Sequence, residues 1–154
     1  SWSSRYYSKK IEYVYLDSGK LLKSKTDGFF QNLTYYFYEG NELVRIVSVG
    51  DQYSQIWEYS YDAKSGQRER AVSRIILLGA DNQIKFSKVT KWNYLIQKGK
   101  LHSAVILETI RYKDGSQKIL QGKEKYIYHP KTGKLNEIKV YREGKLIREL
   151  YFQK

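Results

Sequence analysis

Apolar and polar residues alternate along almost the whole chain, and short glycine-containing joints interrupt the alternation. A period of two is typical of a β-strand with one buried face and one face in water. Joints such as Asp-Gly and Ser-Gly between such strands are typical of consecutive hairpins. The pattern predicts an all-β antiparallel meander of about 10–12 strands, as a twisted open sheet or one curled into a barrel or sandwich. The predicted strands are 11–16, 20–26, 29–38, 42–49, 52–62, 67–78, 83–97, 100–112, 116–121, 124–129, 134–141 and 145–153.

One phrase recurs within this alternation: two tyrosines two positions apart, then a turn and a glycine, then a second strand. The tyrosine pairs are Tyr13 and Tyr15, Tyr36 and Tyr38, Tyr59 and Tyr61, and Tyr126 and Tyr128. Residues two apart on a strand share a face, so we expect each pair to line one side of the sheet. The middle of the chain, after Tyr61, lacks the phrase.

Three segments carry particular expectations. In 68–78 some apolar residues fall at helical spacing, but β-branched side chains and the preceding hairpin-like turn favour a strand over a short helix. The apolar alternation of 84–96 is too long to stay flat, so we expect a bulge or bend there. Gly122-Lys123 is predicted to be a joint between two short strands.

A length of 154 residues with 41% hydrophobic residues fits one domain, 1–154, with a core of its own. No apolar run approaches the roughly 18 residues of a membrane span. Cysteine is absent, which excludes disulfides and thiol chemistry, and methionine is absent too. Because the chain starts at Ser1, we expect an extracytoplasmic protein, secreted or in the cell envelope, that has lost a leader. A chain trimmed for expression fits equally well.

The net charge is +12, from 28 Lys and Arg against 16 Asp and Glu. A basic chain of this kind suits a polyanionic partner such as nucleic acid. A second interpretation is that outward-facing lysines keep an aromatic-rich sheet soluble and protect its edges. The spread of Lys over nearly every predicted strand favours this second interpretation.

Candidate chemistry is sparse in the sequence. Only His102 and His129 could act as an imidazole base, and neither lies in a nucleophile motif. Glu58 and Asp62 fall on one strand face, but strand rise separates them by about 13 Å, too far for paired acid chemistry. Metal-ligand spacings and phosphate-binding loops are absent. The sequence therefore predicts a non-enzymatic protein without a metal or cofactor.

Several phrases resemble known repeats. Gln97-Lys98-Gly99-Lys100-Leu101 and Tyr141-Arg142-Glu143-Gly144-Lys145-Leu146 resemble the Tyr and Gly-Lys-Leu phrase of bacterial MORN-type repeat variants. Tyr59-Ser60-Tyr61-Asp62-Ala63-Lys64-Ser65-Gly66 is similar to the Tyr-Asp repeat of Rhs-type wall and toxin-shell proteins. The resemblance implies β-hairpin ribbons that mediate contacts in envelope-associated or secreted bacterial proteins, and it implies no catalytic residues. The irregular middle of the chain departs from a fixed repeat period.

The candidate ligand-binding segment is 82–107, which contains no acidic residue and interleaves basic with aromatic side chains. The predicted site residues are Lys85, Lys88, Lys91, Trp92, Tyr94, Lys98 and Lys100. Alternation places Phe86, Lys88, Trp92 and Tyr94 on one face. Such a surface can bind a polyanion while its rings stack on bases or sugars; alternatively, the rings belong to the core and the lysines surround them.

These features predict a protein that binds a protein or glycan partner through rows of Tyr and Trp. The alternative is a polyanion binder, for nucleic acid, glycosaminoglycan or anionic lipid, that uses 82–107. With no transmembrane segment in the sequence, membrane association would be peripheral or through a lipid anchor.

Overall fold

The computed structural model describes residues 10–27 and 32–152. All of its regular structure is extended. The strands are β1 (Lys10–Tyr15), β2 (Leu21–Asp27), β3 (Asn32–Glu39), β4 (Glu42–Gly50), β5 (Tyr53–Tyr61), β6 (Arg68–Leu78), β7 (Ile84–Gln97), β8 (Lys100–Tyr112), β9 (Gln117–Tyr128), β10 (Leu135–Arg142) and β11 (Lys145–Tyr151). The predicted joint between strands 20–26 and 29–38, at Asp27-Gly28, and the first residues of the second of these strands lie partly outside the described residues.

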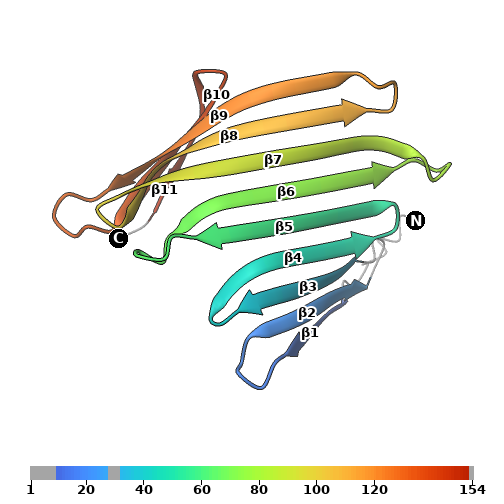
Figure 1. Cartoon of the computed structure of the whole chain (residues 1–154), viewed down its shortest axis with the longest axis horizontal. Helices are drawn as coiled ribbons and strands as arrows, with labels where there is room; N and C mark the ends of the chain where they lie inside the picture. The colour runs from blue at the N-terminus through green and yellow to red at the C-terminus, as the bar shows by residue number, and fades with distance from the viewer. Residues whose placement is uncertain (1–9, 28–31, 153–154) are drawn as a thin grey trace, which may run out of the picture.

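Each strand pairs antiparallel with the next one along the chain, so the described residues form one eleven-stranded meander sheet (Figure 1). The sheet is open: β1 pairs only with β2, and β11 only with β10. This confirms the predicted fold class. The alternative of a helix over 68–78 is wrong, because this segment is strand β6 and pairs along its length with β5 and β7.

The long strands bend where the pattern requires it. The register shifts between Leu95 and Ile96 where β7 pairs with β8, and between Leu77 and Leu78 where β6 pairs with β7. These irregularities lie at both ends of β7 and confirm the expected bulge or bend in 84–96. They let a 14-residue strand follow the twist of the sheet.

The predicted joint at Gly122-Lys123 is wrong, because β9 runs without interruption from Gln117 to Tyr128. Gly122 lies within β9, where its lack of a side chain allows close packing of the neighbouring strands. A Cβ atom there would lie 3.1 Å from the Tyr141 carbonyl oxygen and 3.5 Å from Ile106 Cβ. Only glycine permits the neighbouring backbone and side chain to come this close.

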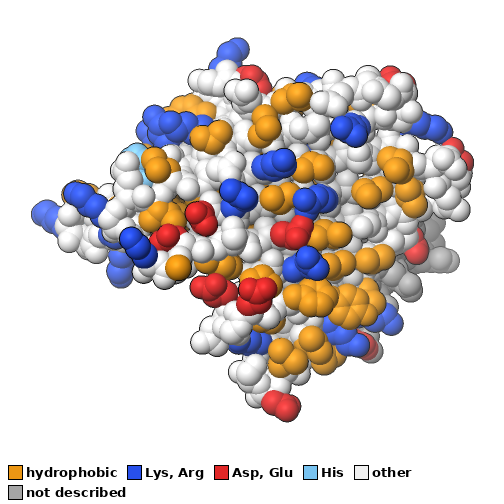
Figure 2. All heavy atoms as spheres, in the orientation of Figure 1, with side chains coloured by type: hydrophobic (Ala, Val, Ile, Leu, Met, Phe, Trp, Pro, Cys, Tyr) orange, Lys and Arg blue, Asp and Glu red, His pale blue; other side chains and the backbone are white. Residues whose placement is uncertain are grey.

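The two faces of the sheet differ in cover. One face carries Trp57, Trp92 and Tyr94, and we call it the concave face because a single hollow on it is lined from β5 to β11. In Figure 1, β10 and β11 pass behind the other strands, which agrees with this curl. The opposite, convex face carries Glu58 and Lys91. Figure 2 shows charged and hydrophobic side chains mixed across this face. The most deeply buried side chains of the described residues are small ones: Ala71, Ser73 and Ala104.

The tyrosine phrase has a structural explanation. In three of the four pairs, the second tyrosine lies at or near the end of its strand, and its hydroxyl donates a hydrogen bond to a leucine carbonyl near the start of the preceding strand. The bonds are Tyr38 to Leu21 at 2.9 Å, Tyr61 to Leu43 at 2.7 Å, and Tyr128 to Leu101 at 2.7 Å. Each bond joins two adjacent strands at the rim of the sheet. The repeated tyrosine phrase therefore serves mainly to stabilise the fold.

A lysine completes two of these contacts. Lys100 Nζ lies 5.0 Å from the centre of the Tyr128 ring and donates a hydrogen bond of 2.8 Å to the Gly133 carbonyl. Lys20 repeats the arrangement, 5.2 Å from the Tyr38 ring centre and hydrogen-bonded to the Gly40 carbonyl. Lys100 therefore has a scaffold contact, although the sequence pattern placed it among ligand-binding residues.

We expect Tyr128→Phe to lower the free energy of unfolding by about 1 kcal/mol, because the Leu101 carbonyl loses its donor. Urea unfolding followed by circular dichroism measures the change. Tyr15→Phe is the matched control, since Tyr15 lies on the first described strand and is largely exposed. An equal effect of both substitutions would contradict the proposed role of the hydroxyl.

Candidate functional site

The concave face contains a hollow of about 430 Å³ with an aromatic wall. The Trp57 and Trp92 rings stack there with their centres 5.1 Å apart and an angle of 27° between planes. Tyr59 extends the row, stacked 6.1 Å from Trp57. Polar groups surround the rings; they are Gln55, Ser73, Lys88, Thr90, Glu108, Glu124 and Arg142. A hollow of this size, with apolar walls and a few polar groups, has the composition of a ligand site.

Small residues on β6, which lies between β5 and β7, allow the Trp57 and Trp92 rings to meet. Trp57 on β5 pairs with Ser73 on β6, and Ala71 on β6 pairs with Trp92 on β7. Ala71 and Ser73 are almost completely buried, so large side chains from the flanking strands cover them. The stacking therefore depends on the register of three strands as well as on the alternation within each.

Glu108 on β8 holds two cations at the edge of the hollow. Its carboxylate lies 3.2 Å from Lys88 Nζ on β7 and 3.2 Å from Arg142 Nη2, two strands away on β10. The Glu108 side chain is only 13% exposed, so the pairing is better shielded from water than an ordinary surface ion pair. The network ties β10 to β7 and β8 and presents donor groups to the hollow.

An arginine and several tyrosines form a second group on the concave face, beside the hollow. The Arg68 guanidinium carbon lies 4.1 Å from the centre of the Tyr59 ring. Arg68 also interacts with the hydroxyls of Tyr94 and Tyr61, while its Nε is buried without a partner. We call this group the Arg68 cluster. It extends the aromatic row toward the β5–β6 and β7–β8 turns.

Burial governs the acidity of these tyrosines. It raises the pKa of Tyr94, while Arg68 opposes the shift. Burial also raises the pKa of Tyr126, whose hydroxyl donates a hydrogen bond of 2.6 Å to Glu124 and gains a further increase from it. Burial raises the pKa of Tyr59 as well. All three therefore stay neutral hydrogen-bonding groups well above neutral pH.

These shifts predict loss of stability in alkali. The unfolded chain releases its tyrosine protons near pH 10, whereas the folded chain retains those of Tyr59, Tyr94 and Tyr126. The stabilising contribution is complete below pH 10 and is lost as pH rises above it, because the unfolded state then binds fewer protons. Urea unfolding from pH 8 to 11 measures this. A urea midpoint that stays unchanged from pH 8 to 11 would contradict this prediction.

The structure separates the predicted site residues. Lys88, Trp92 and Tyr94 lie on the concave face, as alternation predicted. Lys85 and Lys91 alternate to the convex face, and Lys98 lies in the β7–β8 turn, with Lys100 at the start of β8. Of the predicted lysines, only Lys88 therefore lies in the hollow with the Trp92 ring.

Sequence reasoning missed several concave-face residues: Trp57 as a partner of Trp92, Arg68, Glu108 and Arg142. Parity placed Trp57 correctly with Tyr59, but nothing local connects β5 with β7. Glu108 lies just beyond the acid-free segment that drew attention. Glu108 would have been found by a search of the long predicted strands for charged residues that alternate to the same face as Trp92.

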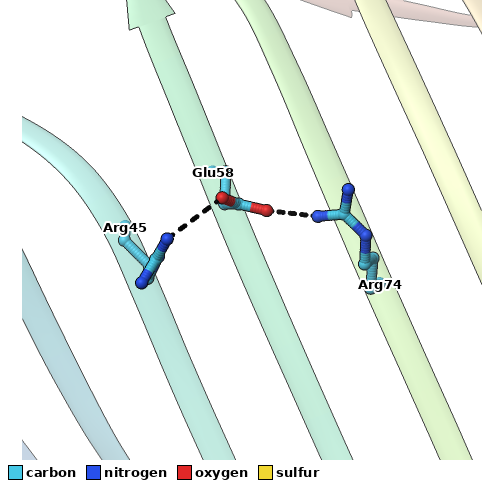
Figure 3. A network of polar contacts seen from close by, with 3 residues as sticks. All are labelled: Arg45, Glu58 and Arg74. Carbon is cyan, nitrogen blue, oxygen red and sulfur yellow. Dashed lines mark hydrogen bonds and ion pairs between the residues drawn. The ribbon is translucent and has the colours of Figure 1, made fainter.

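The convex face has its own ion-pair network, shown in Figure 3. Glu58 on β5 lies between Arg45 on β4, at 3.3 Å, and Arg74 on β6. All three side chains are well exposed, so solvent screens the pairs and their contribution to stability is small. Asp62 lies apart from this network, in the β5–β6 turn, where it accepts hydrogen bonds from Ser65.

His129 has a structural role in the β9–β10 turn. Its Nδ1 accepts hydrogen bonds of 3.2 Å from the backbone amides of Lys131 and Thr132. The backbone bonds of this turn, His129 to Lys134 and Gly133 to His129, match those of the β5–β6 turn. His129 thus caps its turn as Asp62 caps the other one.

No helix within residues 10–27 and 32–152 is long and apolar enough to cross a membrane. The same residues contain no group of three His, Asp or Glu side chains placed to hold a metal ion. The fold defines the chain as an open antiparallel β-meander with an aromatic hollow. Neither the protein-family models nor the curated proteins contain a match to it.

Proposed function

We propose that this is a non-enzymatic binding protein that takes a glycan or a protein segment on its concave Tyr/Trp face. The observation that carries the proposal is the stacked Trp57–Trp92 pair in an open hollow with polar groups around it. Aromatic side chains bring a large contact area with few rotatable bonds, and tryptophans are common binding hot spots.

A glycan suits the hollow better than a protein segment does. A sugar ring has an apolar face that can rest on an indole and hydroxyls at its edge that need donors and acceptors. Lys88, Arg142 and Glu108 supply both kinds of group beside the rings. The aromatic row continues through Tyr59, so an extended oligosaccharide has further rings to contact.

The carboxylates support binding rather than catalysis. Glu108 is held by two cations, and Glu124 accepts a hydrogen bond from Tyr126. Both carboxylates are therefore engaged in stabilising contacts instead of being poised as an acid and a base. The secreted or envelope-associated bacterial setting rests on the resemblance of the hairpin phrases and is part of the same proposal.

The experiment is a titration of the protein with soluble oligosaccharides, followed by tryptophan fluorescence. The panel contains chitohexaose, maltohexaose, cellohexaose and soluble peptidoglycan fragments. We expect at least one to shift the emission saturably, because it covers Trp57 and Trp92. If none binds while tyrosine-rich or acidic peptides do, the partner is a protein; if neither class binds, the proposal fails.

A further inference from the structure

On their convex side, β7, β8 and β9 themselves carry no acidic side chain; Glu143, between β10 and β11, reaches the edge of this surface at the Gln121 amide. The pairing register defines this β7–β9 convex patch. Its residues are Ser87, Val89, Lys91, Asn93 and Leu95 on β7; Ser103, Val105, Leu107, Thr109 and Arg111 on β8; and Gln117, Ile119, Gln121, Lys123 and Lys125 on β9. The acidic residues of these strands, Glu108 and Glu124, alternate to the concave face.

Cations and aliphatic side chains are interleaved across the patch. Lys91 pairs with Leu107, and Val105 pairs with Lys123. The aliphatic members are unusually exposed for their type: Val105 is 58% exposed and Ile119 is 55% exposed. Figure 2 shows basic and hydrophobic side chains lying next to one another on this side of the sheet. Exposed apolar groups that occur together in this way usually mark a contact surface.

A shallow hollow of about 310 Å³ lies within the patch. Lys91 and Arg111 flank it, and Ser87 and Thr109 contribute hydroxyls. Two cations with two neutral donors are the groups that a phosphate needs. No carboxylate contributes to the hollow, so an anion there would meet only attractive groups.

We propose that the β7–β9 convex patch docks on an anionic phospholipid bilayer, with a lipid phosphate between Lys91 and Arg111 and aliphatic side chains in the interface. Basic residues near a bilayer are attracted by anionic headgroups, and apolar side chains between them enter the headgroup boundary. The patch supplies both contributions on one surface.

Other occupants fit less well. A second copy of the chain would bring cations against cations. A single-stranded nucleic acid requires a row of aromatic rings for base stacking. The patch strands contribute none, since Trp92 and Tyr94 lie on the concave face, and a single ring, Tyr141, borders the patch beside Lys125. Protein interfaces favour aromatic residues and are depleted in lysine. The bilayer is the partner that needs only cations and aliphatic groups.

The test is co-sedimentation of the whole protein with phosphatidylcholine vesicles that contain or lack phosphatidylglycerol. We expect binding only with phosphatidylglycerol, weakened at high salt. The double variant Lys91→Glu, Arg111→Glu should bind at least roughly 25-fold more weakly, because each basic residue contributes roughly fivefold and each new carboxylate is repelled by the anionic headgroups. The matched control, Lys64→Glu, Lys131→Glu, changes the net charge equally in two exposed turns and should lose less than roughly threefold. Equal losses in both variants would overturn the proposal.

A second pair separates a bilayer from a soluble polyanion. Val105→Ser, Leu107→Ser should weaken vesicle binding roughly fivefold and leave elution from a heparin column unchanged. Unchanged vesicle binding in this variant would overturn the proposal in favour of a purely electrostatic polyanion surface. Trp92→Ala should retain full vesicle binding, so failure here is distinguishable from failure of the concave face to bind a glycan. Circular dichroism verifies the fold of each variant.

Discussion

Trp92→Ala is expected to weaken binding of the best oligosaccharide about 30-fold, the loss typical of a tryptophan hot spot. The substitution removes one ring of the stacked pair, with centres 5.1 Å apart, and enlarges the hollow at the point where a sugar would rest. Isothermal titration of the wild type and the variant, with the same oligosaccharide, measures the change. Thermal unfolding shows whether the variant keeps its fold.

Phe37→Ala is the matched control for Trp92→Ala. Phe37 is an aromatic residue on the convex face, paired with Arg45, and it is about half exposed. Its removal should change the affinity less than about twofold, since distant surface substitutions have small effects. If Phe37→Ala and Trp92→Ala weaken binding equally, the concave hollow is not the binding site. Trp92→Phe should retain most of the affinity, because a ring remains on the wall.

The second large effect is expected in stability. Arg68→Leu should lower the free energy of unfolding by about 3 kcal/mol, because it breaks a partly buried network of hydrogen bonds and ring contacts. The guanidinium lies 4.1 Å from the Tyr59 ring centre and interacts with the Tyr94 hydroxyl. Without Arg68, both tyrosines lose a favourable partner in a partly buried site. Urea unfolding at neutral pH measures the difference.

Arg70→Leu is the control on the same strand. Arg70 pairs with Ser60 and Asn93, lies on the opposite face and is exposed, so its substitution should change stability by less than about 0.5 kcal/mol. Arg68→Lys should recover little, because an ammonium group does not reproduce the planar stacking of a guanidinium. Equal effects at positions 68 and 70 would show that the cluster does not stabilise the fold.

Local patterns were sufficient to predict the order of strands and turns, except that β9 was predicted as two strands. Period-two alternation locates the strands. Glycines between them locate the turns, and in the structure turn glycines such as Gly133 have the positive φ that a tight reversal requires. Gly122 shows the limit of this reasoning, because a glycine needed for a turn and a glycine needed for close packing look the same in one sequence. Its role depends on Ile106 and Tyr141, which are distant in the chain.

The candidate site was only partly predictable for a related reason. Parity placed Lys88, Trp92 and Tyr94 on one face, but the acid-free, basic composition of 82–107 also brought Lys91 into the predicted site, although the pleat turns it to the other face. The contact between Trp57 and Trp92 depends on register across β6. The pairing of Glu108 with Arg142 depends on the curl of the sheet across β9. Neither relation is local in the sequence.

The central claim, that ligands bind on the concave face, is tested most directly by nuclear magnetic resonance of ¹⁵N-labelled protein during oligosaccharide titration. The account predicts shifts in the indole signals of Trp57 and Trp92 and in the amides of the strands around the hollow. Single Trp→Phe variants assign the indoles. Shifts confined to the β7–β9 convex patch or to the turns, with both indole signals unmoved at saturation, would contradict it.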